Sequence, residues 1–325
     1  MKLSRVQIAI LFLIIANIIW GATAPIFKWA LQDIEPFLFG FLRFLLSALI
    51  LLPFTIHHLK IKKKDIPLLL FIAIIGLGLR IAYDLFGLIL SPSVNAPIIS
   101  SAAPIFILIG GIFLFRERAT KKVFFGGVLS LIGVLVIVLQ PVFEQDIRQS
   151  LLGNIFLIIS AGLMVMYTLF LKQLTPSYRT VTLLFWIFLI AAFTFFPFAY
   201  IETLRSDTGF TINTQGLLGI IFAVLFTTCI AYWMETYAIK HINVSDVGLF
   251  TYMDPFIAIA IAQPLLGETI NSTFILGGAL IFLGLFIAEN RIHYHPIHLL
   301  HPKYKKHLAL AENEETTDKL PPQKP

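Results

Sequence analysis

Long apolar runs are the feature that most limits how this chain can fold. In the first half they cover about residues 6–27, 37–54, 66–90, 96–115 and 123–139. In the second half they cover about residues 151–171, 181–200, 217–239, 247–266 and 273–288. A helix needs about 20 apolar residues to cross about 30 Å of hydrocarbon. We therefore predict an all-α integral membrane protein with ten transmembrane helices, the fifth and tenth being short.

The composition also indicates a bilayer as the surrounding solvent. The 325 residues are 58% hydrophobic and 13% charged, and the mean hydropathy is +0.88. Soluble domains have about 45–50% apolar and about 25% charged residues, so this chain lacks the charge for a soluble surface. The single cysteine, Cys229, excludes a disulfide within the chain.

The first apolar run needs to be distinguished from a signal peptide. It follows Lys2 and Arg5, and Ala22-Thr23-Ala24 resembles a small-residue cleavage site. Cleavage there would cut the first helix and leave an odd number of spans. We interpret the run as a retained transmembrane helix.

Basic residues fall mainly on one side of the predicted spans. If the N-terminus is cytoplasmic, the cytoplasmic side holds thirteen of them before the tail is counted: Lys2, Arg5, Lys60, Lys62, Lys63, Lys64, Arg116, Arg118, Lys121, Lys122, Lys172, Arg179 and Lys240. The other side holds three, Lys28, Arg148 and Arg205. Because Lys and Arg concentrate in cytoplasmic loops, we predict a multi-pass protein of the plasma (inner) membrane with both termini cytoplasmic. Contact with anionic membrane lipid explains the net charge of +6 without nucleic acid.

Several features recur after 151 residues. The offset pairs Pro104 with Pro255, Glu117 with Glu268, Gly126-Gly127 with Gly277-Gly278, Gly133 with Gly284, and Asp84 with Glu235. We predict two repeats, at 1–145 and 146–290, and a basic, His-containing, partly disordered cytoplasmic tail at 291–325. Five spans per repeat would insert the second repeat upside down, an arrangement that recurs in secondary transporters. We expect a monomer or a homodimer.

Four short motifs are distributed over both repeats. They are Trp20-Gly21-Ala22 with Pro25 and Lys28, Phe41-Leu42-Arg43-Phe44, Ala103-Pro104 through Phe115-Arg116-Glu117-Arg118, and Asp254-Pro255 through Leu266-Gly267-Glu268. Over about residues 6–290 the chain resembles the EamA-type members of the drug/metabolite transporter (DMT) superfamily. The resemblance implies ten helices, with peripheral fifth and tenth helices, and transport of metabolites, amino acids or nucleotide-sugar-like solutes. It supplies no universal catalytic set.

Five ionisable side chains lie inside the predicted spans: Arg43, Arg80, Asp84, Glu235 and Asp254. Each costs about 2.5–3.5 kcal/mol at the centre of a membrane helix on insertion scales, so they should face one another or a wet cavity. Arg80 and Asp84 are one turn apart, and either form an ion pair or border the cavity. Arg43 either lines the cavity or extends toward the outer interface. Asp84 and Glu235, as repeat mates, should lie at opposite depths.

Pro104 and Pro255 mark predicted breaks in the middle of two helices. A mid-helix proline frees a carbonyl and kinks the helix, and paired breaks often border a transport site. A packing kink without ligand contact is the alternative. A buried Asp254 beside such a break could bind a proton near neutral pH.

Aromatic residues accompany the charged positions. Trp20, Tyr83 and Trp233 are candidates for a cation–π or stacking wall, and Tyr252 adjoins the Asp254 region. Packing and interfacial belts are the alternative reading of such rings.

The sequence contains no Walker-type phosphate loop, H-E-x-x-H or G-x-S-x-G motif. The tail histidines His293, His295, His298, His301 and His307 suit an interfacial segment better than a metal site. We therefore predict no enzyme, metal or cofactor, but a secondary active transporter of a small polar or charged metabolite, working by alternating access with proton coupling or exchange. The alternatives are a lipid-modifying enzyme, with Asp84, Glu235 or Asp254 as acid or base, and a sensor or scaffold without flux.

Overall fold

The computed structural model describes residues 4–103, 121–143, 149–205, 212–242, 247 and 250–289. Within these residues every regular element is helical, which confirms the all-α prediction. Six helices are long and apolar enough to cross a membrane: Arg5–Ala30, Pro36–His58, Lys63–Leu90, Ser150–Leu174, Thr180–Arg205 and Thr214–His241. Shorter apolar helices cover Phe124–Leu139, Phe250–Leu266 and Ser272–Ile287. Pro104, Glu117 and the tail 291–325 with its histidines lie outside the described residues.

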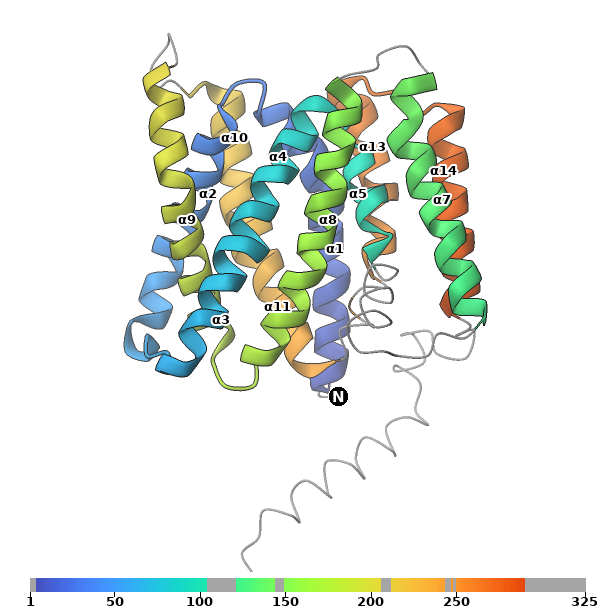
Figure 1. Cartoon of the computed structure of the whole chain (residues 1–325). Coiled ribbons are helices and arrows are strands. Elements are labelled where there is room, and N and C mark those ends of the chain that lie inside the picture. Colours follow the sequence, from blue (N-terminus) through green and yellow to red (C-terminus); the bar gives the residue numbers. More distant parts are fainter. Residues whose placement is uncertain are drawn as a thin grey trace, which may run out of the picture.

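The helices form one bundle whose long axes run roughly parallel or antiparallel (Figure 1). The first half contains α1 (Arg5–Ala30), α2 (Pro36–Thr55), the short η1 (Ile56–His58) and η2 (Lys63–Asp65), α3 (Ile66–Phe71), η3 (Ile72–Leu79), α4 (Arg80–Leu90), α5 (Asn95–Ser100) and α7 (Lys121–Phe143). The second half contains α8 (Gln149–Leu174), α9 (Thr180–Arg205), α10 (Thr214–Phe222), η4 (Ala223–Ala231), α11 (Tyr232–His241), η5 (Phe250–Met253), α13 (Asp254–Leu266) and α14 (Ser272–Glu289).

Large apolar side chains remain on the outside of this bundle. Phe54, Phe193, Phe256 and Phe286 are each more than 60% exposed. Exposure of so many large apolar groups is unfavourable in water but suits a surface in contact with lipid tails. The outer surface therefore agrees with the apolar runs in assigning the bundle to a membrane.

Two of the longest helices are interrupted by wider π-helical turns. They occupy η3, from Ile72, and η4, which starts at Ala223. Ala223 lies 151 residues after Ile72, the same offset that relates the sequence motifs. The first residues after the two π segments are Arg80 and Tyr232, and Arg80 Nη1 donates a hydrogen bond to the Tyr232 hydroxyl at 2.8 Å. Because π turns often occur at functional sites, the region around the Arg80–Tyr232 hydrogen bond is a candidate for the functional site.

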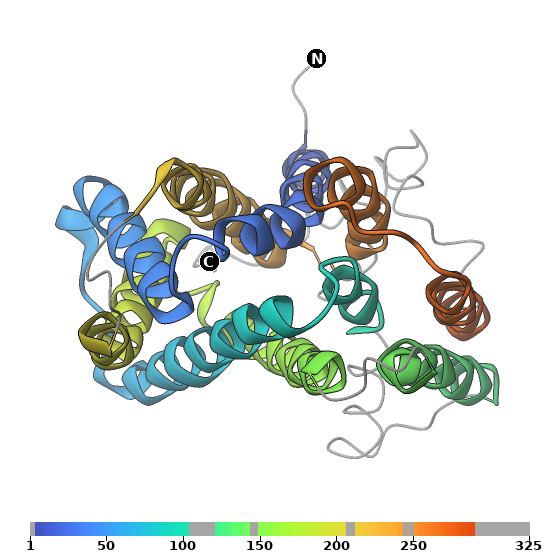
Figure 2. The same cartoon turned by 90° about the horizontal axis from the view of Figure 1, so that it is seen from above.

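Glycines let α7 and α14 pack closely at the edge of the bundle (Figure 2). A Cβ atom on Gly133 would lie 2.6 Å from the Gly277 carbonyl oxygen, and one on Gly284 would lie 2.5 Å from the Gly126 carbonyl oxygen. Small residues at such crossings allow two membrane helices to approach. From Gly126 to Gly133 along α7, the contacted residues on α14 run backward from Gly284 to Gly277, so the pair is antiparallel. Its edge position agrees with the peripheral location that the family resemblance implied.

Pro255 occupies a different place from the predicted mid-helix break. The α-helix α13 begins at Asp254, after the 3₁₀ turn η5, so Pro255 lies in its first turn. Proline fits there because the first backbone N–H groups of a helix have no intrahelical acceptor. The residue therefore starts a helical segment rather than kinking one.

Candidate functional site

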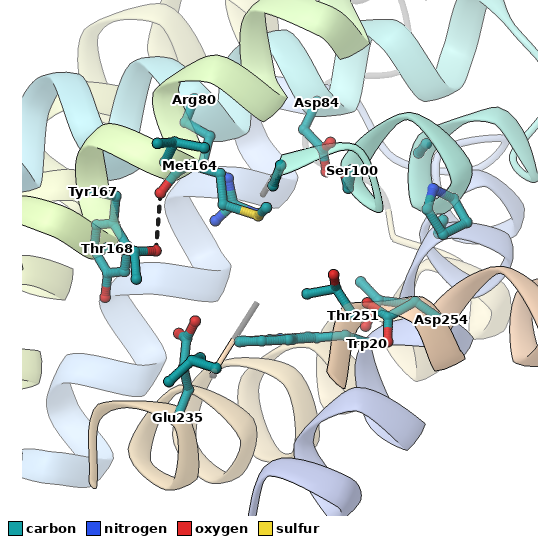
Figure 3. Close-up of a pocket in the computed structure, with 17 residues that line it drawn as sticks. Trp20, Arg80, Asp84, Ser100, Met164, Tyr167, Thr168, Glu235, Thr251 and Asp254 are labelled. Atoms are coloured by element: carbon teal, nitrogen blue, oxygen red, sulfur yellow. Dashed lines mark hydrogen bonds between the residues drawn. The ribbon is translucent and has the colours of Figure 1, made fainter. Parts of the chain in front are cut away.

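A cavity of about 110 Å³, with a mainly apolar lining that includes several charged side chains, lies between α1, α4, α5, α8, α11, η5 and α13. Its lining comes from both halves of the chain (Figure 3). The first half contributes Trp20, Thr23, Ala24, Arg80, Asp84, Ala96, Pro97, Ser100 and Ala103. The second half contributes Met164, Val165, Tyr167, Thr168, Glu235, Val247, Thr251 and Asp254. The space is large enough for several water molecules and holds four of the five predicted ionisable residues.

Tyr232 fixes the position of Arg80 from behind the cavity wall. Its hydroxyl accepts the Arg80 Nη1 hydrogen bond at 2.8 Å, and its ring is 2% exposed. The ring packs edge-on against Trp20, Tyr167 and Phe188, with centroid separations of 5.6, 6.0 and 5.7 Å. Edge-to-face packing of this kind is favourable. Arg80 Nε is buried and has no hydrogen-bond partner in the described structure, and the residue lines the cavity.

Three carboxyl groups share the cavity with this one guanidinium. Asp84 Oδ1 accepts a hydrogen bond from Ser160 Oγ at 3.2 Å. Glu235 and Asp254 are each only 7% exposed, and Asp254 Oδ1 has no partner among the described residues. Figure 3 shows Arg80 and Asp84 on one side of the opening and Glu235 and Asp254 on the other. With every group ionised, the cavity carries excess negative charge.

The direct ion pair between Arg80 and Asp84 does not form. Among the described residues, the one ion pair within 4 Å joins Lys28 and Glu268. Arg80 and Asp84 both line the cavity instead. Of the two alternatives, an ion pair or two residues that border the cavity, the structure therefore shows the second.

Arg43 lies outside the cavity lining and does not extend toward an interface. The side chain is 1% exposed. Its Nε donates to Thr228 Oγ1 at 2.7 Å, and its guanidinium carbon lies 4.9 Å from the Phe27 ring centroid and 5.1 Å from that of Phe44. Hydrogen bonding and aromatic faces thus hold this cation within the protein interior.

Three predicted aromatic residues also pack away from the cavity lining. Tyr83 contacts Phe156 at 5.4 Å between centroids, and Trp233 contacts Phe12 at 5.2 Å. Tyr252 contacts Phe282 at 6.0 Å. Pro255 is absent from the lining too. Tyr83, Trp233 and Tyr252 therefore have the packing role that was the alternative interpretation of the sequence, whereas Trp20 borders the cavity.

The sequence reasoning did not select the contribution of α8. Met164 and Thr168 line the cavity and Ser160 binds Asp84. These three residues recur every fourth position and so lie on one helix face. That spacing is a usable signal in the sequence, although none of the three residues is charged. Within the described residues, no three His, Cys, Asp or Glu side chains gather into a metal-binding group.

A polar cluster joins three segments at the end of the bundle opposite the N-terminus (Figure 1). Lys28 Nζ lies 3.0 Å from Glu268 Oε1 and donates to the Ser91 carbonyl oxygen at 2.6 Å. Glu268 Oε1 accepts from Ser93 N, and its Oε2 accepts from Ser93 Oγ, both at 2.8 Å. We call Lys28, Ser91, Ser93 and Glu268 the end cluster. It connects α1 to the turns that follow α4 and α13.

Comparison with known proteins agrees with this arrangement. The model of the EamA-like transporter family matches residues 7–139 and, a second time, residues 151–289. This chain belongs to the EamA-like transporter family. The EamA-like chain is thus a multi-pass membrane protein of a transporter family.

Relatives of this EamA-like protein have similar lengths. An "Uncharacterized transporter" of Archaeoglobus fulgidus is 25% identical over 84% of this chain and 95% of its own. "Uncharacterized transporter YetK" of Bacillus subtilis is 26% identical, covering 84% of each chain. A "Probable amino-acid metabolite efflux pump" of Salmonella typhimurium is 26% identical over 83% of this chain and 91% of its own.

A solved crystal structure, for example, shares the fold of the EamA-like chain. It has a TM-score of 0.62 at 17% sequence identity. The match covers 86% of this chain and 96% of the other.

Proposed function

We propose that this protein is a secondary active transporter of a small polar or charged metabolite, an amino acid or similar solute, that works by alternating access. The observation that carries the proposal is the cavity with Arg80, Asp84, Glu235 and Asp254 inside an apolar bundle. Ionisable groups at membrane depth are costly and usually border a substrate or ion path. A scaffold without flux has no need of such a cavity.

The chemistry of the cavity favours a solute that carries both charges. Arg80 can bind a carboxylate through charge-assisted hydrogen bonds, and the carboxyl groups can bind an ammonium group. Three carboxyl groups against one guanidinium leave room for a proton or a second cationic group. Proton coupling or exchange follows from this imbalance. The name of the Salmonella typhimurium relative makes amino acids the first solutes to test.

We further propose ten transmembrane helices arranged as two inverted repeats, 1–145 and 146–290, with a cytoplasmic tail at 291–325. Three observations support this: the family model matches twice, the π segments start 151 residues apart, and α7 and α14 pack antiparallel through matched glycines. Exchange of conformation between such repeats gives alternating access.

The proposed orientation in the plasma (inner) membrane places both termini in the cytoplasm. The basic loop at Lys60–Lys64 then lies at the cytoplasmic face and Glu35 at the other. Glu35→Cys and Lys60→Cys, each in a Cys229→Ser background, should react with an impermeant maleimide from opposite sides. Labelling of both from one side would contradict the orientation.

Counterflow in proteoliposomes tests the transport function. The reconstituted full chain should exchange internal unlabelled amino acid for external labelled amino acid with saturation. Asp84→Asn removes a cavity charge without changing side-chain size, and should abolish exchange or its pH dependence while the protein keeps its melting temperature. Glu35→Gln, at an exposed position outside the cavity, is the matched control and should behave like the parent.

Each outcome separates the three classes of function. Saturable exchange supports a transporter. Turnover of lipid in detergent without any gradient would favour a membrane enzyme instead. Absence of both would favour a sensor or scaffold.

A further inference from the structure

Asp254 is a buried carboxyl group of the cavity, and one of its oxygens, Oδ1, has no hydrogen-bond partner among the described residues. Its side chain is 7% exposed. Asp84, by comparison, accepts one from Ser160. A carboxyl oxygen removed from water without a new donor is unfavourable. A bound ligand that donates a hydrogen bond to the Asp254 carboxylate would compensate for this loss of hydration.

The indole of Trp20 supplies a second feature at the same place. Figure 3 shows the ring edge-on between Glu235 and Asp254, so that one face is turned toward the open centre of the cavity. Trp20 is partly buried and its orientation is supported by the edge-on contact with Tyr232 at 5.6 Å. The face of a tryptophan ring carries negative electrostatic potential and attracts cations.

Gly21 explains why these two groups lie together. A Cβ atom there would lie 2.9 Å from the Asp254 carbonyl oxygen and 2.7 Å from Ile257 Cβ. Only glycine therefore allows α1 to touch the start of α13 in this arrangement. Trp20 directly precedes Gly21, so this close contact between the two halves of the chain also places Trp20 near Asp254.

Neutralising groups are absent from this end of the cavity. Within the described part of the chain, no Lys, Arg or His nitrogen lies within 4 Å of the Asp254 carboxylate. The cavity guanidinium, Arg80, is held by Tyr232 beside Met164 (Figure 3). An anionic group would be repelled at Asp254, whereas an ammonium group would meet both a carboxylate and an aromatic face.

We propose that Asp254 and Trp20 form an ammonium-binding subsite, which selects amine cations over organic anions. The amine donates a hydrogen bond to the Asp254 carboxylate, which lines the cavity, and places its charge over the indole. The inference rests on the proposed transport function and adds the chemical class of the solute. The shared chemistry covers the α-ammonium group of an amino acid and the end of a diamine.

Binding to the purified full chain in detergent tests the subsite by isothermal titration calorimetry. Norleucine carries an ammonium and a carboxylate group, hexanoate is the same molecule without the ammonium, and cadaverine has two ammonium groups and no carboxylate. Norleucine should bind about ten-fold or more tightly than hexanoate, a difference expected for loss of a charge-assisted hydrogen bond. Cadaverine binding shows whether the carboxylate is required.

Variants identify the residues responsible. Asp254→Asn should weaken norleucine about ten-fold and should not weaken hexanoate. Trp20→Leu should weaken norleucine about five-fold, and Trp20→Phe, which keeps a ring face, about two-fold. Glu35→Gln is the control and should bind like the parent. The Trp20 variants keep the test decisive if Asp254→Asn does not fold.

The proposal is overturned if hexanoate binds as tightly as norleucine, if neither amine binds, or if neither the Asp254 nor the Trp20 variants weaken amine binding. Amine binding without counterflow would remove the transport function but retain the subsite. Counterflow that carries hexanoate and is indifferent to Asp254→Asn would retain transport but remove the subsite.

Discussion

At the residue scale, two arginines inside the bundle have different roles because one tyrosine separates them. Arg80 reaches the Tyr232 hydroxyl from the cavity. Arg43 lies with its guanidinium carbon 5.9 Å from the centroid of the same ring. The aromatic faces and Thr228 stabilise Arg43 without an ion-paired carboxylate among the described residues. Its charge is therefore a part of the packed interior.

Arg43→Lys should destabilise the protein by roughly 2 kcal/mol. A guanidinium stacks on aromatic rings and donates through a rigid plane, whereas an ammonium is a compact point charge. The measurement is the melting temperature in detergent, and Lys60→Arg, on an exposed loop, should leave it unchanged. An unaltered melting temperature for Arg43→Lys would show that aromatic stacking does not hold this residue.

At the scale of elements, close helix contacts in this bundle depend on the positions of glycine residues. The α7–α14 pair is in contact through Gly126, Gly133, Gly277 and Gly284. Ser130 adds a hydrogen bond from its Oγ to the Ile281 carbonyl oxygen at 2.9 Å. Since lipid is as apolar as a leucine side chain, close packing and such bonds hold membrane helices together.

Gly133→Ala should lower stability by about 1–3 kcal/mol, because the new methyl group overlaps the Gly277 carbonyl oxygen. Gly162→Ala is the control, since a Cβ there meets nothing within 4 Å. In that open position alanine should stabilise α8 by about 0.5–1 kcal/mol, its ordinary helix preference over glycine. Thermal unfolding of the two variants should shift in opposite directions. A Gly133→Ala protein as stable as its Gly162→Ala counterpart would disprove the close crossing.

At the scale of the whole molecule, the end cluster connects parts of the chain that alternating access would have to separate. Lys28 belongs to the first half and Glu268 to the second, and their side chains are 23% and 13% exposed. The opposite end has its own connections. There Trp186 Nε1 donates to the Leu59 carbonyl oxygen at 2.9 Å, and Lys172 Nζ to that of Ile242 at 2.8 Å. Opening at either end would break the bond that joins the two halves there, Lys28 to Glu268 or Trp186 to Leu59, while the other remains.

Glu268→Gln should open the cavity more often at the face of the end cluster. Removing the charge weakens hydrogen bonds worth about 1.5–3 kcal/mol each, so labelling should accelerate about three- to ten-fold. The reporter is Ser100→Cys, a cavity position, in the Cys229→Ser background with an impermeant maleimide. Glu35→Gln at the same end serves as control. Equal labelling rates with and without Glu268→Gln would mean that the end cluster does not restrict access.

The apolar runs by themselves determined that this chain is helical and membrane-embedded, since lengths near 20 apolar residues have few other uses. The cost of placing charge in hydrocarbon also predicted that four ionisable residues of the cavity face inward. They are Arg80, Asp84, Glu235 and Asp254. Only the tertiary structure decided which aromatic residues pack elsewhere, that Arg43 lies behind Tyr232, and that Lys28 meets Glu268. The reason is that most of these helices are apolar on nearly every face, so their sequences reveal little of their rotation; α4, with Arg80 and Asp84 on one face, is the exception. Contacts across the bundle select the side chains that reach the cavity.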